Sequence, residues 1–151
     1  MTPSIVIRNA LSADLPTIVD FNCRLALETE AKTLDRITVT SGVAAVLSDV
    51  RKGRYFVAES AGQMVGQLMI TYEWSDWRNG NIWWLQSVYV AAEYRRAGVF
   101  KRLMEHLSDT QASDPEAIGL RLYVDEGNQT AQATYLRLGF ELGHYRVMER
   151  L

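Results

Sequence analysis

The amino-acid sequence predicts a single α/β domain in which about four helices flank a mixed central β-sheet. The chain has 151 residues, of which 48% are apolar and 23% charged, enough for one core beneath an ordinary solvated surface. Segments with helical spacing separate the early strand-like segments from the late ones, and hairpins lie in the middle. No repeat, linker or low-complexity tract divides the sequence. We therefore expect one domain that covers residues 1–151.

Four helices are expected from apolar residues that recur three and four positions apart. Ser12 is the predicted N-cap of the first helix, and Thr40 or Ser41 is the predicted cap of the second. Gly53 is expected to end the second helix, because glycine accepts the left-handed conformation that terminates helices. The helices are expected at residues 12–28, 43–50, 100–107 and 128–138.

Runs of β-branched and aromatic residues, bounded by turn residues, predict the strands. A tight turn at residues 61–63 joins two of them into a hairpin, and a polar loop from Glu73 to Asn81 leads to the next strand. A terminal strand or hairpin is expected from Phe140 to Glu149. The strands are expected at residues 5–8, 55–58, 64–72, 83–90, 119–124 and 140–149.

Composition excludes several classes of partner. The net charge is −2 and no run of basic residues exceeds two, which argues against a nucleic acid. Cys23 is the single cysteine, and His106 and His144 lie far apart, so we expect no metal. No apolar stretch approaches the ~20 residues that span a bilayer, and no signal peptide is visible. We therefore expect a cytoplasmic protein that does not bind membranes.

The most informative segment is a strand, a short loop and an amphipathic helix over residues 87–101. A helix N-terminus carries unpaired N–H groups and the positive end of the helix dipole, and both favour a phosphate group. Ala97 and Gly98 keep this backbone accessible, while basic side chains nearby supply charge. The segment lacks the glycine and lysine pattern of nucleoside-triphosphatase loops and the three glycines of dinucleotide-binding loops. An ordinary strand, turn and helix is the alternative interpretation.

A second motif begins about thirty residues after this loop. It has the spacing Asn-x-x-Ala-x-x-x-Tyr-x-x-x-Gly-Phe and runs from Asn128 to Phe140. Together with the Arg-x-x-Gly sequence of the loop, this motif closely resembles the GNAT superfamily of acyl-CoA-dependent N-acetyltransferases. The resemblance extends over essentially the whole chain. It implies the GNAT fold, acetyl-CoA as co-substrate and an N-acetyltransferase activity.

The resemblance also implies which residues bind coenzyme A. The loop amides would hold the pyrophosphate, and the strand before the loop would pair with the pantetheine amides as an added strand does. Asn128 would contact the cofactor near pantetheine, and Tyr135 would reach the thioester sulfur. Phe100 departs from the family pattern, in which a small residue is usual at this position. The implied cofactor-binding residues are Val88, Tyr89, Val90, Arg95, Arg96, Ala97, Gly98, Val99, Phe100, Lys101, Asn128 and Tyr135.

The expected chemistry is direct attack of an amine on the thioester, so no enzyme nucleophile is required and Cys23 is expected to fill the core. Tyr135 is the predicted donor of a proton to the departing thiolate, with simple packing as the alternative. Many relatives carry a glutamate as base where this sequence has Gln86. Glu73 is therefore the candidate base, acting through water, although a solvated carboxylate is an equal alternative.

Acidic and aromatic residues suggest a cationic acceptor, through ion pairing and cation–π contacts. They gather in the segment from Thr71 to Arg78 and in the polar stretch after the first helix. The tryptophans have an alternative role at a sheet edge or a dimer interface. The candidate acceptor residues are Glu28, Glu30, Glu73, Trp74 and Gln86.

We therefore expect an enzyme that acetylates a primary amine on a small, polyamine-like molecule. Two alternatives remain open: an acyl-CoA-binding sensor without turnover, suggested by Gln86 and Phe100, and an acetyltransferase for protein lysines or N-termini. A homodimer is expected, because dimers are frequent in the superfamily that the sequence resembles.

Overall fold

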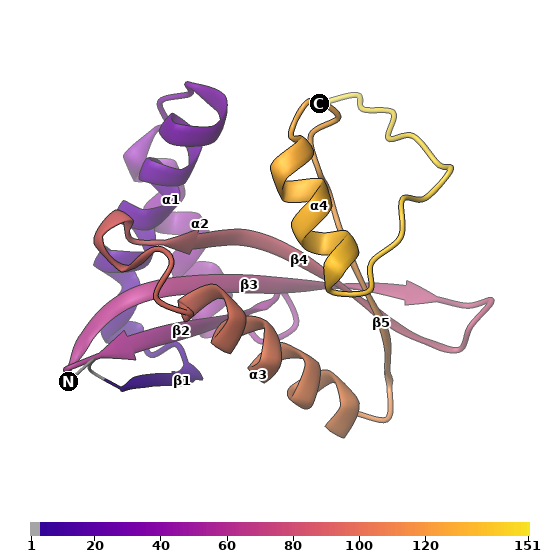
Figure 1. Ribbon diagram of the computed structural model, residues 1–151, viewed down its shortest axis with the longest axis horizontal. Coiled ribbons are helices and arrows are strands. Elements are labelled where there is room, and N and C mark those ends of the chain that lie inside the picture. Colours follow the sequence, from indigo (N-terminus) through magenta and orange to yellow (C-terminus); the bar gives the residue numbers. More distant parts are fainter. Residues whose placement is uncertain (1–3) are drawn as a thin grey trace.

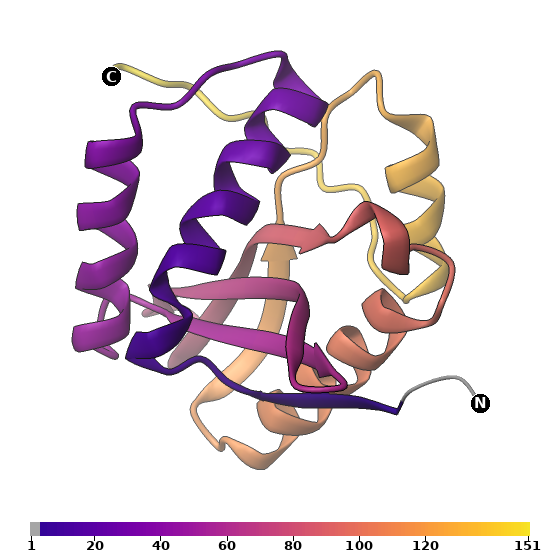
Figure 2. The same cartoon turned by 90° about the vertical axis from the view of Figure 1, so that its left-hand side faces the viewer.

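A computed structural model describes residues 4–151 as one five-stranded sheet with helices on both faces (Figures 1 and 2). The strand order is β1-β2-β3-β4-β5; neighbours are antiparallel except β4 and β5, which are parallel. This is the mixed α/β sheet that the sequence predicts. The strands are β1 (Ile5–Asn9), β2 (Arg54–Ser60), β3 (Gln63–Ser75), β4 (Gly80–Val90) and β5 (Ala117–Leu122).

Two helices cover each face of the sheet. The pair α1 and α2 packs on one face, and α3 and α4 lie on the other, where Leu103 and Tyr135 join the larger core. Side chains of successive strand residues point to opposite faces, and β2 follows this alternation. Tyr55 packs towards α1 and α2, whereas Phe56 packs towards α3. The helices are α1 (Leu15–Glu30), α2 (Arg36–Ser48), α3 (Val99–Ser113) and α4 (Gln129–Arg137).

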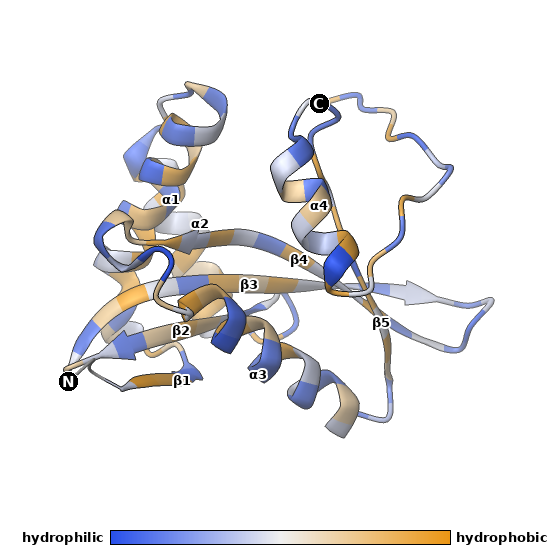
Figure 3. Cartoon of the chain, in the orientation of Figure 1, coloured by the Kyte–Doolittle hydropathy of each residue, from blue (hydrophilic) through white to orange (hydrophobic). Residues whose placement is uncertain are grey.

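Hydrophobic residues follow this layering. In Figure 3 they dominate the middle of β3, while the helices carry hydrophilic residues on part of their surface. Trp83, Phe56 and Leu68 are among the largest fully buried side chains. The sheet therefore carries most of the core, as expected for a sheet that is covered on both faces.

The beginnings of the first two helices differ from the prediction. Ser12 does not cap α1, because residues 12–14 form a 3₁₀ turn and the Asp14 carboxylate accepts a hydrogen bond from Leu11 N at 2.7 Å. The second helix starts seven residues before the predicted position, because Asp35 caps it by accepting from Thr38 N at 3.1 Å. Because Asp35 lies within a polar stretch, the sequence predicted a loop at this position instead of the start of a helix.

Three further predictions were wrong. The helix α2 ends at Ser48, so Gly53 lies in the turn before β2 instead of ending a helix. The predicted loop from Glu73 to Asn81 is mostly strand, because residues 73–75 pair with residues 80–82. The predicted terminal strand, Phe140 to Glu149, is absent from the described chain, where no residue after α4 belongs to a helix or strand.

No helix in the described part of the chain is both long and apolar enough to cross a membrane.

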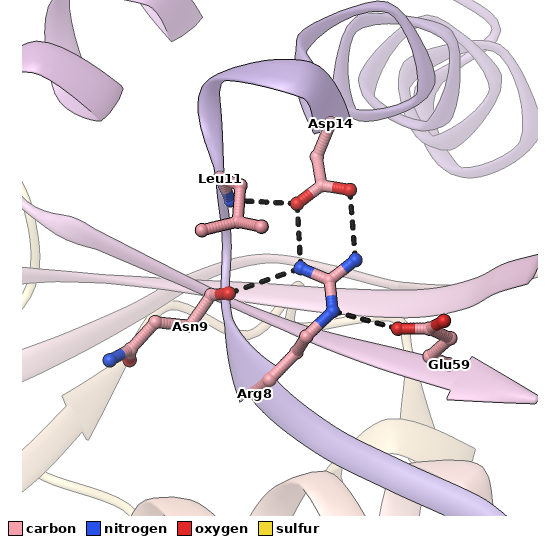
Figure 4. Close-up of polar contacts among 5 residues, drawn as sticks. All are labelled: Arg8, Asn9, Leu11, Asp14 and Glu59. Atoms are coloured by element: carbon pink, nitrogen blue, oxygen red, sulfur yellow. Dashed lines mark hydrogen bonds and ion pairs between the residues drawn. The ribbon is translucent and has the colours of Figure 1, made fainter. Parts of the chain in front are cut away.

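An ion-pair network ties the first strand to the start of α1 (Figure 4). The Arg8 guanidinium donates to both carboxylate oxygens of Asp14, at 2.8 and 3.0 Å, and to Glu59 at 2.8 Å. Asp14 also accepts from Leu11 N, so a single carboxylate orients the chain between β1 and α1. The hydrogen bond from Arg8 lowers the pKa of Asp14 below its ordinary value of 3.8.

Replacing Asp14 with asparagine is expected to lower the free energy of unfolding at pH 7 by about 1–3 kcal/mol, since a charge-assisted bond to Arg8 is lost. Because the folded-state pKa of Asp14 lies below the unfolded value, its contribution is complete above that value. The contribution disappears as the pH falls through the folded-state pKa. Denaturant titrations at pH 7 and at low pH check this. Asp109→Asn, at an exposed carboxylate, is the control, and an equal loss at both pH values would contradict the account.

Candidate active site

The sheet opens between β4 and β5. The two parallel strands are paired only from Asn81 to Leu85 on β4, although β4 continues to Val90. In Figure 1 the two strands diverge beyond the paired part. Residues 86–90 of β4 therefore have no neighbouring strand on that side, and this edge can pair with an added extended ligand, although Val90 O already accepts a hydrogen bond from Arg95. The predicted cofactor residues Val88, Tyr89 and Val90 lie on this free edge.

A β-bulge accompanies the opening. The register between β3 and β4 shifts between Gln67 and Met69, and Ser87, opposite this shift, has a φ of +51°. A non-glycine residue with positive φ is uncommon and needs support from its surroundings. Bulges bend the strand that carries the extra residue. The bulge at Ser87 thus turns the last part of β4 away from β5.

A buried polar network braces the bulge, and the sequence analysis missed it. The side chain of Gln67 is fully buried, and its amide nitrogen donates to Ser87 O at 3.1 Å and to Asn22 Oδ1 at 2.8 Å. Asn22 in turn donates to the Tyr55 hydroxyl at 3.1 Å. The available signal was the glutamine itself, because an amide within the apolar run of β3 must find partners.

Replacing Gln67 with methionine keeps the approximate volume but removes the donor to Ser87 O. We expect the KM for acetyl-CoA, the co-substrate that the family resemblance implies, to rise by up to about tenfold, the equivalent of one lost hydrogen bond. Gln63→Met, at an exposed position at the start of the same strand, is the matched control. Steady-state kinetics check the result, with circular dichroism as the test of folding. An unchanged KM in a folded variant would show that the bulge holds without Gln67.

The loop between β4 and α3 presents free backbone N–H groups. Within the described chain, the N–H groups of Arg96, Ala97 and Gly98 have no hydrogen-bond acceptor. The first bond of α3 is donated by Arg102 N to Gly98 O, at 3.0 Å, so the amides of its first turn are also free. Gly98 has a φ of +83°, and no atom lies within 4 Å of the position of a β-carbon. The loop can therefore hold an anion against the helix N-terminus.

Arg95 and Glu28, which the sequence analysis assigned to different ligands, bind each other in the described chain. Arg95 donates to Glu28 Oε2 at 2.7 Å and to Val90 O at 2.9 Å, and its guanidinium lies over the Tyr89 ring. The Tyr89 hydroxyl donates to the other oxygen of Glu28 at 3.1 Å. The hydrogen bond from Arg95 lowers the pKa of Glu28. This contact fastens the end of α1 to the end of β4.

Glu73, the predicted base, is held by two donors. Trp84 Nε1 donates to one carboxylate oxygen at 3.0 Å and Arg121 Nη1 to the other at 2.7 Å. Gln86 donates to the Thr71 hydroxyl at 2.6 Å. These five side chains share the sheet face that α1 and α2 cover, because their positions on β3, β4 and β5 alternate in step.

The predicted acidic and aromatic acceptor cluster is divided by the strands. Trp74 follows Glu73 within β3, so it points to the opposite face, where it is exposed. Trp83 is buried in the core beneath α3, while Trp84 stacks on Tyr123 with ring centroids 4.5 Å apart. Glu30 lies exposed at the end of α1. The prediction of the cluster assumed that the segment after Glu73 is a loop. Residues 73–75 instead belong to β3, and neighbouring side chains of a strand point to opposite faces.

Tyr135 projects from α4 into the larger core. Its half-buried ring meets Phe100 and Phe140 edge-on, with centroids 6.0 and 5.5 Å away. Burial raises the pKa of the hydroxyl above its ordinary value of 10.0. Phe100, the departure from the family pattern, supports the tyrosine ring. The Asn128 side chain caps α4 by accepting from Ala131 N at 3.0 Å.

Across residues 4–151, no three histidine, cysteine, aspartate or glutamate side chains gather in a way that could hold a metal ion.

An open sheet edge beside a helix N-terminus with free amides is the arrangement of a protein that binds an extended ligand carrying phosphate groups. The acetyltransferase (GNAT) domain family matches residues 51–142, which include the bulge, the loop and α4. The match covers more than half of the chain. The chain therefore belongs to the GNAT acetyltransferase family.

Solved structures support this assignment. A possible acetyltransferase from Clostridium difficile 630 is 48% identical, with a TM-score of 0.93 over 97% of each chain. A "predicted acetyltransferase with acetyl-CoA" from Clostridium acetobutylicum is 15% identical, with a TM-score of 0.79 over 97% of this chain and 96% of that one. Glucosamine-6-phosphate N-acetyltransferase from Arabidopsis thaliana is 16% identical, with a TM-score of 0.73 over 97% and 98%. The last two show a shared fold. None of the curated proteins matches the sequence.

Proposed function

We propose that the protein is an N-acetyltransferase that moves an acetyl group from acetyl-CoA to a primary amine of a small cationic molecule. The observation that carries the proposal is the free edge of β4, from Gln86 to Val90, which leads directly into the loop with unpaired amides. Pantetheine is an extended chain with amide groups and ends in a pyrophosphate. The free edge suits the pantetheine chain, and the loop that follows the edge suits the pyrophosphate that follows this chain.

The proposed binding mode uses backbone groups first. The edge at Val88 to Val90 pairs with the pantetheine amides, and the amides of residues 96–101 hold the pyrophosphate at the start of α3. Lys101 and Arg96 lie beside these amides and supply compensating charge. Arg95 acts indirectly, because its bonds to Glu28 and Val90 O fix the path of the loop.

The proposed reaction is direct attack, for which bound acetyl-CoA supplies a thioester carbonyl as the electrophile. A backbone N–H of the β4 edge stabilises the oxyanion that forms on attack. The Tyr135 hydroxyl, whose pKa is raised by burial, donates its proton to the thiolate as it leaves. Cys23 packs within the core between α1 and α2 and takes no part.

The amine must lose a proton before or during attack, and Glu73 is the proposed acceptor, through a water molecule. Glu73 and Gln86 lie on the face covered by α1 and α2, whereas Tyr135 lies on the other face. The opening between β4 and β5 is the passage between the two. The amine then approaches the thioester from the face opposite to the tyrosine.

The acceptor is proposed to be small and cationic. Its charge would meet the acidic side chains Glu28 and Glu30 at the end of α1, together with Glu73. Arg95 neutralises part of this charge in the described structure, so a cationic acceptor would compete with Arg95 for Glu28.

A second candidate function is an acyl-CoA-binding module without turnover. It is favoured by the bonds of Glu73 to Arg121 and Trp84, because each oxygen of the candidate base already accepts a hydrogen bond within the sheet. A macromolecular amine, such as a protein lysine or N-terminus, has no comparable observation in its favour.

Thiol release from acetyl-CoA, measured with polyamines, amino acids and aminoglycosides, tests the proposal. We expect release that depends on a primary amine, with the fastest rates for diamines and polyamines. Calorimetry with acetyl-CoA provides the companion measurement. Tight binding without release across the whole panel would favour the module without turnover.

A further inference from the structure

A chain of hydrogen bonds runs from the buried core to the bulge of β4, and the chemistry of its members fixes which atom donates at each step. Ser87 O, a backbone carbonyl, can only accept, so the amide nitrogen of Gln67 faces it at 3.1 Å. The same nitrogen donates to Asn22 Oδ1 at 2.8 Å, and Asn22 Nδ2 donates to the Tyr55 hydroxyl at 3.1 Å. The Tyr55 oxygen therefore accepts from Asn22, and its own proton needs a further acceptor.

The side chain of Ser87 is that acceptor. Tyr55 is only 5% exposed, and its hydroxyl hydrogen-bonds the half-buried Ser87 side chain. A serine oxygen has two lone pairs and one proton. Since Tyr55 occupies one lone pair, the other lone pair can accept a hydrogen bond from a bound ligand. The chain of donors thus ends on a hydroxyl whose oxygen is held in place from the core.

The bulge places this hydroxyl on the sheet face from which the amine is proposed to approach. Val88 packs in the core beneath α3, whereas Tyr89 packs against α1. Side chains alternate along a strand, so Ser87 faces α1 as Tyr89 does. Because the bulge interrupts this alternation, Gln86 also lies on the face of α1, where it donates to Thr71. Two consecutive polar side chains therefore meet at the opening of the sheet.

Ser87 also lies at the level of the thioester in the proposed binding mode. The loop proposed to hold the pyrophosphate follows the end of β4, so the pantetheine chain would run back along the free edge from Val90 to Val88. Pairing between β4 and β5 resumes at Leu85. The sulfur end of the ligand would therefore stop between Leu85 and Val88, beside Ser87.

We propose that the Ser87 hydroxyl holds the attacking amine, its free lone pair accepting an N–H of the acceptor so that the nitrogen points at the thioester carbon. The inference rests on the proposed function and deepens it, because it assigns the side chain that orients the nucleophile. Tyr55 is a positioning residue, since its hydroxyl acts only through Ser87. Glu73 keeps the proposed role of proton acceptor, and no proton passes to the serine.

Ser87→Gly tests the proposal, because glycine removes the hydroxyl and adopts the φ of +51° without strain. We expect kcat/KM for the amine to fall about tenfold, the equivalent of one hydrogen bond, and the KM for acetyl-CoA to stay at the wild-type value. The amine is the one that gives the fastest thiol release in the panel of polyamines, amino acids and aminoglycosides. Titration of this amine into protein saturated with coenzyme A should show a similar rise in its Kd.

Further variants separate the hydroxyl from the backbone. Ser87→Ala keeps a β-carbon and should lose the same kcat/KM as Ser87→Gly. Tyr55→Phe should lose less, and combining it with Ser87→Gly should cause no additional loss, because the tyrosine acts through the serine. Ser60→Ala, which removes a buried hydroxyl at the end of β2, is the control and should keep the wild-type kinetics. Circular dichroism and the melting temperature confirm that each variant is folded.

The outcomes distinguish this inference from the function on which it rests. A wild-type kcat/KM for the amine in folded Ser87→Gly, or a loss confined to Ser87→Ala, would overturn the inference and leave the proposed function intact. An equal rise in the KM for acetyl-CoA would overturn it as well, because the serine would then act on the bulge alone, as expected for Gln67. A wild type that releases no thiol with any amine would overturn both.

Discussion

Replacing Tyr135 with phenylalanine is expected to lower kcat and kcat/KM together by about a hundredfold, the usual effect of a lost general acid. The substitution removes only the hydroxyl, while the ring keeps its edge-on contacts with Phe100 and Phe140. Because the hydroxyl is proposed to assist the thiolate only as it leaves, its loss should affect the transition state and not the bound ground state. Calorimetry should therefore give nearly the wild-type affinity for acetyl-CoA.

The control for this prediction is Tyr72→Phe. Tyr72 is also half-buried and meets Trp83 edge-on, with centroids 6.2 Å apart, but it lies on β3 away from α4. This variant should retain the wild-type kcat, and both variants should retain the wild-type melting temperature. A wild-type kcat in the Tyr135 variant would make the tyrosine a packing residue, and the proton would have to come from water.

Replacing Gly98 with aspartate is expected to raise the Kd for coenzyme A at least about tenfold, or about 1.4 kcal/mol. The open space at the Gly98 β-carbon position is where the pyrophosphate is proposed to sit, so the new carboxylate would meet a like charge there. Titration calorimetry with coenzyme A measures the change directly. The effect should be larger at low salt, because screening weakens repulsion between exposed charges.

Gly98 also has a positive φ, and any side chain strains the backbone there. Gly62→Asp controls for this strain, because Gly62 has a φ of +78° and equally open surroundings in the β2–β3 turn. We expect both variants to lose similar stability and only Gly98→Asp to lose affinity. A wild-type affinity for coenzyme A in a folded Gly98→Asp variant would show that the pyrophosphate does not bind at this loop.

Much of the fold was predictable because its elements follow local patterns. The apolar spacing from Phe100 to Leu107 placed α3, and the helix predicted at residues 128–138 corresponds to α4, which Asn128 caps. The errors arose where a polar residue is compatible with two kinds of local structure. Asp35 lies in a polar stretch but starts a helix, and Glu73 lies among polar residues but belongs to a strand. Only the strand that pairs with the residue, or the amide that it caps, decides which of these structures forms. Neither partner can be identified from the sequence.

The candidate site was predictable in part for the same reason. Motif spacing singled out Gly98 and Tyr135 as candidates, and a turn and a helix set their local conformation. The bulge at Ser87 and its brace by Gln67 depend on contacts between residues 20 positions apart. The bond between Glu28 and Arg95 spans 67 positions. Such contacts arise from the folded sheet and changed the roles assigned to single side chains.

The most direct test of the account is transfer of an isotope-labelled acetyl group. Mass spectrometry measures the masses of both the amine and the protein after the reaction. The protein is incubated with labelled acetyl-CoA and a polyamine. Direct attack at the open edge of β4 predicts label on a primary amine nitrogen of the acceptor and none on the protein. Retention of the label on acetyl-CoA that remains bound, or a stable labelled adduct on Cys23, would contradict the account.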